Sequence, residues 1–172
     1  MIDKTTIKDY IGTWWLSAIM LPICAYFVFF YPTSTFMDNA DLLIHEAGHF
    51  FFGFFGQFIR VLGGTIMQIV LPGLLIWHFF AHGYRTGTQI ALFWLGHNLL
   101  NIAVYASDAR TRQLPLLGGN KSGHDWHYLL GRLGILEFDQ AVGTVFAILG
   151  AVVFLILIIL PQYAMWSGSE ES

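Results

Sequence analysis

The chain has 172 residues, of which 56% are hydrophobic and 11% are charged, and its mean hydropathy is +0.61. This composition excludes an ordinary soluble domain and indicates an integral membrane protein, because a spanning helix needs about 20 predominantly apolar residues. The net charge of -3, without a basic cluster, argues against a nucleic-acid partner. Cys24 is the only cysteine, which excludes a disulfide framework and a thiolate metal site.

Apolar stretches predict an all-α, polytopic membrane helix bundle that forms a single domain of about five transmembrane helices. The first stretch is too long for the core of a signal peptide and is read as a spanning helix. We expect the five spans at about residues 13–31, 40–59, 65–81, 89–106 and 140–160.

Glycine and proline residues suggest where the second and third spans are broken. We predict that Arg60, Gly63 and Gly64 end the second helix, and that Pro72-Gly73 interrupts the third. An interruption at membrane depth would free backbone carbonyls that a neighbouring helix or a polar cavity must satisfy. A kink that serves only packing is the alternative.

The one long polar stretch covers residues 107–138, and we expect it to be partly re-entrant. Its aromatic and leucine content after Gly123 argues against disorder. With five spans, this loop and the N-terminus share one side of the membrane, which leaves Arg85 as the only basic residue on the other side. The positive-inside rule then predicts a multi-pass protein of the plasma membrane with a cytoplasmic N-terminus.

Residues 41–53 place His45, Glu46 and His49 inside an otherwise apolar run. Residues four apart share one face of a helix, so both imidazoles can bind one ion. Histidines that only hydrogen-bond to neighbours are the alternative, but ionisable groups buried together in a membrane need partners or a metal. We predict a zinc site with His45 and His49 as ligands and Glu46 as the general base.

The segment His45-Glu46-Ala47-Gly48-His49 resembles the site-2 protease family of intramembrane zinc metalloproteases. The resemblance implies that the two histidines bind zinc, that the glutamate activates water, and that an aspartate from a later helix is the third ligand. The family presents this aspartate in a Pro-x-Asp-Gly-like or Leu-Asp-Gly turn, whereas Leu117 stands at the corresponding position here. The third ligand must therefore come from elsewhere in this chain.

Polar residues in and after the fourth predicted span are the candidates for the third ligand: His97, Asp108, His124, Asp125 and His127. We prefer Asp125 or His124, because the cluster His-Asp-Trp-His follows a glycine-rich turn. If the second helix spans the membrane, however, its histidines lie about 17 to 22 Å from the cytoplasmic end, and this cluster must fold deep into the bundle. Without such re-entry we expect His97 to be the ligand, although interhelical hydrogen bonding explains His97 and Asn101 equally well.

Two other functions are compatible with these residues. The pairs His45/His49, His78/His82 and His124/His127 are reminiscent of the histidine boxes of membrane diiron desaturases and hydroxylases, but those boxes usually contain adjacent histidines and none occur here. The second alternative is a non-catalytic metal-binding membrane protein. Glu46 favours a hydrolase, because a structural zinc site closed by four ligands needs no base.

The substrate of such a hydrolase is indicated only in outline. The family resemblance implies a transmembrane peptide, and a lipid-like ester or amide suits the same chemistry. Gln68 or Asn101 is expected to help hold the oxyanion, because each is polar within a predicted span. Membrane lipid is the expected environment, and the sequence does not indicate an oligomeric state.

Overall fold

The computed structural model describes residues 4–31, 35–114 and 123–163. Within them the protein is all-α, as predicted. Six α-helices are formed: α1 (Lys4–Phe30), α2 (Phe36–Phe51), α3 (Gln57–Ala81), α4 (Arg85–Ser107), α5 (Asp125–Leu133) and α6 (Asp139–Tyr163). Two short 3-10 helices, η1 (Gly53–Phe55) and η3 (Leu136–Phe138), precede α3 and α6.

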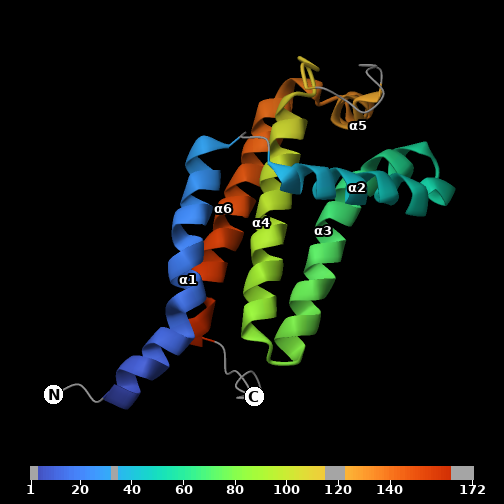
Figure 1. Ribbon diagram of the computed structural model, residues 1–172. Coiled ribbons are helices and arrows are strands. Elements are labelled where there is room, and N and C mark those ends of the chain that lie inside the picture. Colours follow the sequence, from blue (N-terminus) through green and yellow to red (C-terminus); the bar gives the residue numbers. More distant parts are fainter. Residues whose placement is uncertain (1–3, 32–34, 115–122, 164–172) are drawn as a thin grey trace.

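Four stretches of the described chain are long and apolar enough to cross a membrane. They are Ile11–Phe30 in α1, Gln57–Ala81 (α3), Arg85–Ser107 (α4) and Leu136–Pro161, which contains most of α6. Figure 1 shows the four long helices running lengthwise beside one another. A short turn near one end joins α3 to α4. By their length and composition, these four helices could cross a membrane side by side.

Helix α2 is not a fifth span. It has 16 residues, fewer than the about 20 that cross a bilayer, and it lies across the long helices near one end of the bundle (Figure 1). Its buried residues Asp41, His45 and Gly48 form one stripe, whereas Leu43 and Phe50 are 72% and 73% exposed. The predicted span 40–59 is therefore broken, because the chain turns through η1 and Gly56, whose φ is 86°.

Gly63 and Gly64 lie inside α3, contrary to the prediction that they end a helix. A Cβ atom at Gly48 of α2 would overlap the backbone of Gly63, and one at Gly64 would overlap the ring of His45. These glycines therefore allow the backbones of α2 and α3 to touch where the helices cross. Pro72 also lies within an unbroken α3, so the expected interruption is not found.

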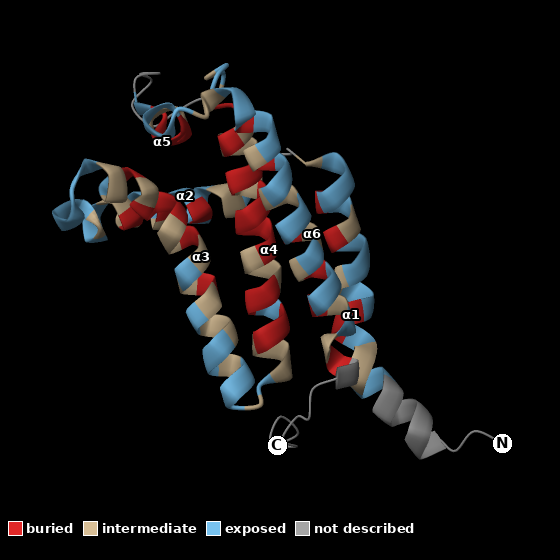
Figure 2. Ribbon diagram, turned by 180° about the vertical axis from the view of Figure 1, so that it is seen from behind, coloured by how far each residue is buried: buried red, intermediate tan, exposed pale blue. Residues whose placement is uncertain are grey.

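Helix α4 is the centre of the bundle. Its spanning segment is 56% buried, whereas the other three are 22% to 28% buried. Figure 2 shows the buried residues concentrated along it. One apolar cluster joins α4 to α1 and α6, and includes Phe27, Leu92, Leu100, Phe154 and Leu157. A second joins it to α3 and α5, and includes Val61, Ile102, Ala106, Leu129 and Leu130.

In the part of the chain that the structure describes, the two ends of the bundle carry similar numbers of basic residues. Helix α1 begins and α6 ends at one end, and α5 lies at the other (Figure 1). In the described chain, Lys4, Lys8 and Arg85 lie towards the first end, and Arg60, Arg110, Arg112 and Arg132 towards the second. The charge asymmetry that indicated a cytoplasmic N-terminus depended on five spans and is not present in this arrangement.

We expect the substitution Gly48→Ala to destabilise the protein, because the added methyl group overlaps Gly63 and pushes α2 away from α3. Overpacking of this kind typically costs about 1–3 kcal/mol. Thermal unfolding in detergent, followed by circular dichroism, measures the effect.

The matched control is Gly73→Ala in α3, where an added Cβ meets nothing within 4 Å. This variant should unfold at the wild-type temperature or slightly above it, because alanine is the better helix former. Equal unfolding temperatures for Gly48→Ala and wild type would show that α2 and α3 do not touch at this crossing.

Candidate metal centre

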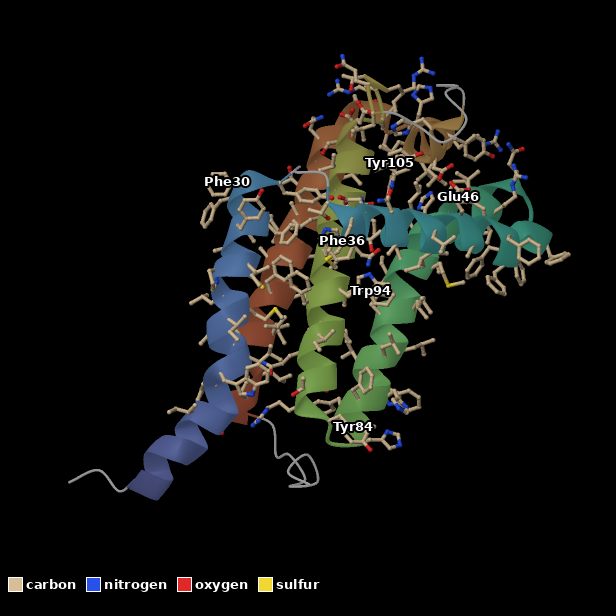
Figure 3. The ribbon with its side chains drawn as sticks, in the orientation of Figure 1. Phe30, Phe36, Glu46, Tyr84, Trp94 and Tyr105 are labelled. Atoms are coloured by element: carbon tan, nitrogen blue, oxygen red, sulfur yellow. The ribbon has the colours of Figure 1, made fainter. Side chains whose placement is uncertain are left out.

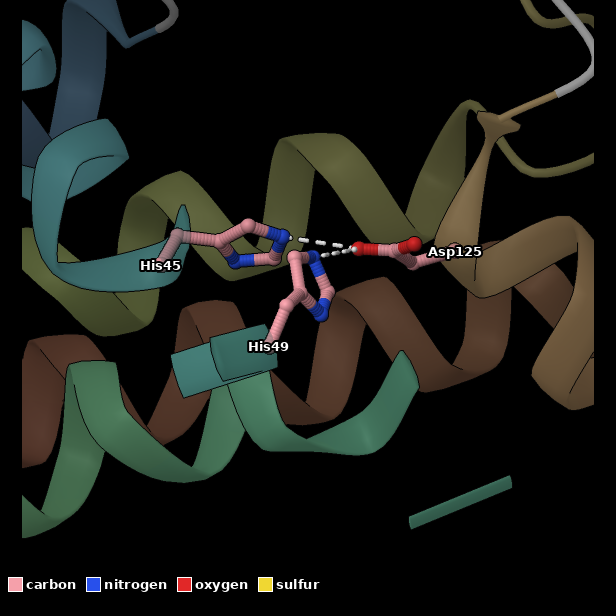
Figure 4. Close-up of side chains that lie close together, drawn as sticks. All are labelled: His45, His49 and Asp125. Carbon is pink, nitrogen blue, oxygen red and sulfur yellow. Dashed lines mark hydrogen bonds and ion pairs between the residues drawn. The ribbon is translucent and has the colours of Figure 1, made fainter. Parts of the chain in front are cut away.

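Three candidate ligands converge where α2 meets α5. His45 and His49 lie one turn apart on α2, and Asp125 is the first residue of α5. The Nε2 atom of His45 lies 2.7 Å from Oδ2 of Asp125, and Nε2 of His49 lies 3.1 Å from the same oxygen (Figure 4). One ligand atom from each residue lies within 4.8 Å of the others, so this group is able to hold a metal ion.

Helix α5 is held in place by its apolar face and by its N-terminus. Trp126, Leu129 and Leu130 are buried in the cluster shared with α3 and α4. Nδ1 of His124 accepts a hydrogen bond from the backbone N–H of His127 and so caps the helix. The backbone N–H of Asp125 donates to the hydroxyl of Tyr105 at 3.0 Å. These contacts bring the Asp125 carboxylate to the two histidines.

The second nitrogen of each histidine ring determines which atom faces the centre. Nδ1 of His45 lies 2.9 Å from Oε1 of Gln68, and Nδ1 of His49 lies 2.9 Å from the carbonyl oxygen of Arg60. Because a carbonyl oxygen can only accept, each Nδ1 carries a proton, and in a neutral ring each Nε2 presents a lone pair. Two lone pairs then face a carboxylate oxygen, an arrangement that needs additional protons or a cation between the three atoms.

A hydrogen-bond chain behind His45 fixes its orientation. Nε2 of Gln68 donates to Oδ1 of Asn101 at 3.1 Å, and Nδ2 of Asn101 donates to Oδ1 of Asp38 at 3.2 Å. A carboxylate can only accept, so Asp38 determines how both amides are turned. The amides of Gln68 and Asn101 therefore orient the ring of His45 through hydrogen bonds. This role differs from the oxyanion binding that was expected from the sequence.

Burial and hydrogen bonding together set the charge at this centre. The side chains of His45, Asp125 and His49 are 7%, 12% and 23% exposed. Burial alone would raise the pKa of Asp125, but its hydrogen bonds with His45 and His49 outweigh burial and the pKa is lowered. The hydrogen bond to Asp125 raises the pKa of His49 in turn. Asp125 is thus kept ionised, which is the form that binds a cation.

Glu46 lies beside this group without belonging to it. It follows His45 on α2, and its side chain is exposed. Figure 3 shows Glu46 and Tyr105 at the end of the bundle where α2 and α5 lie. Glu46 thus adds an exposed carboxylate to α2, directly after the candidate ligand His45 in the chain.

His124 and Asp108 lie outside the group of three. The ring of His124 lies tilted against that of Tyr105 with a centroid distance of 4.4 Å, and its Nε2 lies 3.4 Å from Oδ2 of Asp108. Burial lowers the pKa of His124. Asp108 also accepts hydrogen bonds from the backbone N–H groups of Gln113 and Leu114. These two residues shape the start of the connection between α4 and α5.

His127 and Leu117 complete the set of positions that the sequence singled out around α5. Nδ1 of His127 donates to the carbonyl oxygen of Ala109 at 2.8 Å, so His127 also secures the connection after α4. The turn in which Leu117 replaces the expected acid lies outside the described residues. Of the five candidates for the third ligand, the structure brings only Asp125 to His45 and His49 in the described chain.

The depth argument that favoured His97 does not hold, because α2 lies across the bundle. Distance along α2 therefore does not measure depth in the membrane, and α5 reaches the two histidines from the same end of the bundle (Figure 1). His97 belongs instead to a second buried group, with Asp38 and Asp41. His78 and His82 lie near the opposite end of α3, so the described histidines do not gather at one centre.

Two features of the site were missed from the sequence. Tyr105 was not singled out, and nothing in its local sequence marks it. Asp38 and Asp41 were not identified as site residues either, although Asp38, Asp41, His45 and Gly48 recur every three to four residues. This spacing places all four on one stripe of a helix and was the available signal for an inward-facing polar surface.

Comparison of the chain with models of known protein families, with curated proteins and with solved structures finds no match. The chemistry of the site is therefore the basis for any functional proposal.

We expect Gln68→Leu to weaken zinc binding by about 10- to 100-fold, the usual effect of removing a partner that orients a metal-binding histidine. A competition titration against a chromogenic chelator measures the affinity. The matched control is Gln89→Leu, since Gln89 is equally buried but bonds to Ser17 and Leu157, away from this group. Equal losses in both variants would show a general effect of disturbing the bundle.

Proposed function

We propose that the protein is a membrane-embedded zinc-dependent hydrolase, specifically an intramembrane metalloprotease with Glu46 as general base. The observation that carries the proposal is the convergence of two histidines and Asp125 beside a solvent-exposed glutamate. Two histidines and one carboxylate are the ligands of many catalytic zinc sites, which keep a fourth position open. No fourth protein ligand joins the group among the described residues.

The proposed mechanism assigns a task to each side chain. Zinc held by His45, His49 and Asp125 would supply a Lewis acid that activates water and polarises a carbonyl group. Glu46 would accept the proton of the attacking water and return it to the leaving group. Gln68 would hold the His45 ring in the orientation that keeps Nε2 towards the centre.

The proposed substrate is a peptide segment within or at the edge of the membrane, and a lipid-like ester or amide is the alternative. Helix α2 exposes Leu43, Phe50 and Phe51 while its polar stripe faces inward, so the same helix contacts lipid and carries the two histidines. An apolar chain can thus approach the site from the bilayer. The resemblance of His45–His49 to the site-2 protease motif supports a peptide substrate.

The proposed location is the plasma membrane, as a multi-pass protein surrounded by lipid. The four candidate spans support insertion in a membrane. We propose no orientation, because the basic residues of the described chain divide almost evenly between the two ends of the bundle.

We expect Glu46→Gln to leave zinc content unchanged and to lower hydrolysis by about 100-fold or more, the usual contribution of a general base. Purified protein is reconstituted in vesicles with a panel of single-span model peptides, and cleavage is followed by mass spectrometry. Zinc content is measured on the same samples. Asp125→Ala should lose both zinc and cleavage.

The matched control is Glu137→Gln, which removes an exposed glutamate in η3. It should cleave at the wild-type rate. Cleavage that persists in Glu46→Gln would eliminate Glu46 as the base. Stoichiometric zinc without cleavage of any peptide by the wild type would favour the non-catalytic metal-binding protein.

A further inference from the structure

The buried group Asp38, Asp41 and His97 joins two helices at a point away from the proposed catalytic centre. Asp38 and Asp41 lie one turn apart on α2, and His97 comes from the middle of α4. One ligand atom from each lies within 4.8 Å of the others. We propose that these residues form a second cation site, which takes a divalent ion of the zinc type and does not depend on the proposed hydrolase activity.

Charge is the first argument for an ion at this position. The side chains of Asp41 and His97 are 0% exposed, and that of Asp38 is 22% exposed. Among the described residues, neither carboxylate has a lysine or arginine within 4.0 Å, and His97 is the only basic side chain paired with them. Even a protonated imidazole would leave two carboxylates facing one positive charge in a buried place, which is costly.

The hydrogen-bond donors around the two carboxylates do not supply the missing charge. Asp41 accepts from the indole N–H of Trp94 at 2.9 Å, and Asp38 accepts from the hydroxyl of Tyr31 and the amide of Asn101, each at 3.2 Å. These donors are neutral, and so are the backbone N–H and the hydroxyl of Thr35, which donate to Oδ2 of Asp38 at 2.6 and 3.2 Å. Asp38 is also stabilised by the N-terminus of α2, but Asp41 lies one turn further along the helix.

The unpartnered nitrogen of His97 is the second and independent argument. Nδ1 of His97 lies 2.6 Å from Oδ2 of Asp41, so Nδ1 donates and in a neutral ring Nε2 presents a lone pair. That Nε2 is buried and has no hydrogen-bond partner. His97 thus has the same arrangement as His45, with one nitrogen held by an acceptor and the other facing a carboxylate.

The distance across the site fits an ion better than a direct bond. Nε2 of His97 lies 4.0 Å from Oδ1 of Asp38. This separation is too long for a hydrogen bond. A tetrahedral zinc-type ion with bonds of about 2.0–2.1 Å places a nitrogen and an oxygen ligand roughly 3.4 Å apart, so binding an ion would draw these two atoms slightly closer together. We therefore assign Nε2 of His97 and Oδ1 of Asp38 as direct ligands, with Asp41 holding the imidazole and completing the charge balance.

The surroundings indicate that this ion would hold neighbouring helices together. The ring of Phe27 packs edge-on against His97 with a centroid distance of 4.9 Å, and the ring of Tyr31 lies at 6.0 Å. The ring of Phe27 in α1 and that of Tyr31 just after α1 cover the imidazole. An ion bound at this site would therefore link α2 to α4 on the side of His97 that faces α1. Asp38 is also the last residue of the hydrogen-bond chain that leads to His45. An ion bound at Asp38 would therefore also help to fix the orientation of His45 in the first centre.

The test is the zinc stoichiometry of full-length protein in detergent, dialysed against a zinc buffer and analysed for metal and protein. All samples carry His78→Ala and His82→Ala, because this exposed pair on α3 is able to take up zinc adventitiously. We expect two ions per chain in this background. We expect one in the further variant His45→Ala/His49→Ala, one in His97→Ala, and none when all three histidines are replaced.

The outcomes separate the two proposals. A single ion that is lost in His45→Ala/His49→Ala and kept in His97→Ala overturns the second site and leaves the hydrolase proposal intact. A single ion with the opposite dependence supports the second site and removes the metal centre of the hydrolase. If His97→Ala fails to fold, Asp38→Asn replaces it, since the amide oxygen of asparagine can still accept the hydrogen bond from the backbone N–H of Thr35, the N-cap of α2. In that case the site is supported if the variant His45→Ala/His49→Ala retains one ion and loses it when Asp38→Asn is added. The site is overturned if His45→Ala/His49→Ala retains no ion.

Discussion

The burial of the polar stripe of α2 against α3 and α4 is the interaction on which the rest of the structure depends. In lipid, polar groups must find partners inside the protein, because no water is there to satisfy them. Asp41 and His45 find these partners in Trp94 and His97 of α4 and in Gln68 of α3. Helix α2 is therefore fixed in rotation, with its apolar side chains outward and its polar side chains inward.

This requirement explains why a short helix crosses a bundle of long ones. The partners of α2 lie at successive levels of α4, since His97, Asn101 and Tyr105 are each one turn apart. Residues of α2 bond to the first two of these levels, and the backbone of Asp125 at the start of α5 bonds to the third. Close approach to α3 is possible because Gly48 and Gly63 lie at the crossing. Close packing against α3 and hydrogen bonding to α4 thus require the same position of α2.

The parts of the site that are local in sequence could be predicted, and those that depend on docking could not. The pairing of His45 with His49 follows from helical spacing alone, whatever the direction of the helix. The local cluster around Asp125 indicated Asp125 or His124 as the third ligand. The choice between these two, and against His97, depends on how α5 packs through Trp126 and Leu129, which no local pattern records. The hydrophobic run over 40–59 has the composition of a span, and only its inward polar stripe indicates that it lies across the bundle. Gly63 and Gly64 are equally ambiguous, because glycine both ends helices and permits close contact between them.

The order of the ligands along the chain has a consequence for biosynthesis. His45 and His49 lie in the first third of the sequence, whereas Asp125 follows the third of the four candidate spans and comes just before the last. During translation, the two histidines are therefore made long before their carboxylate partner. A nascent chain that stops before α5 carries an incomplete centre, so under the proposed function hydrolysis would begin only after most of the bundle has been made.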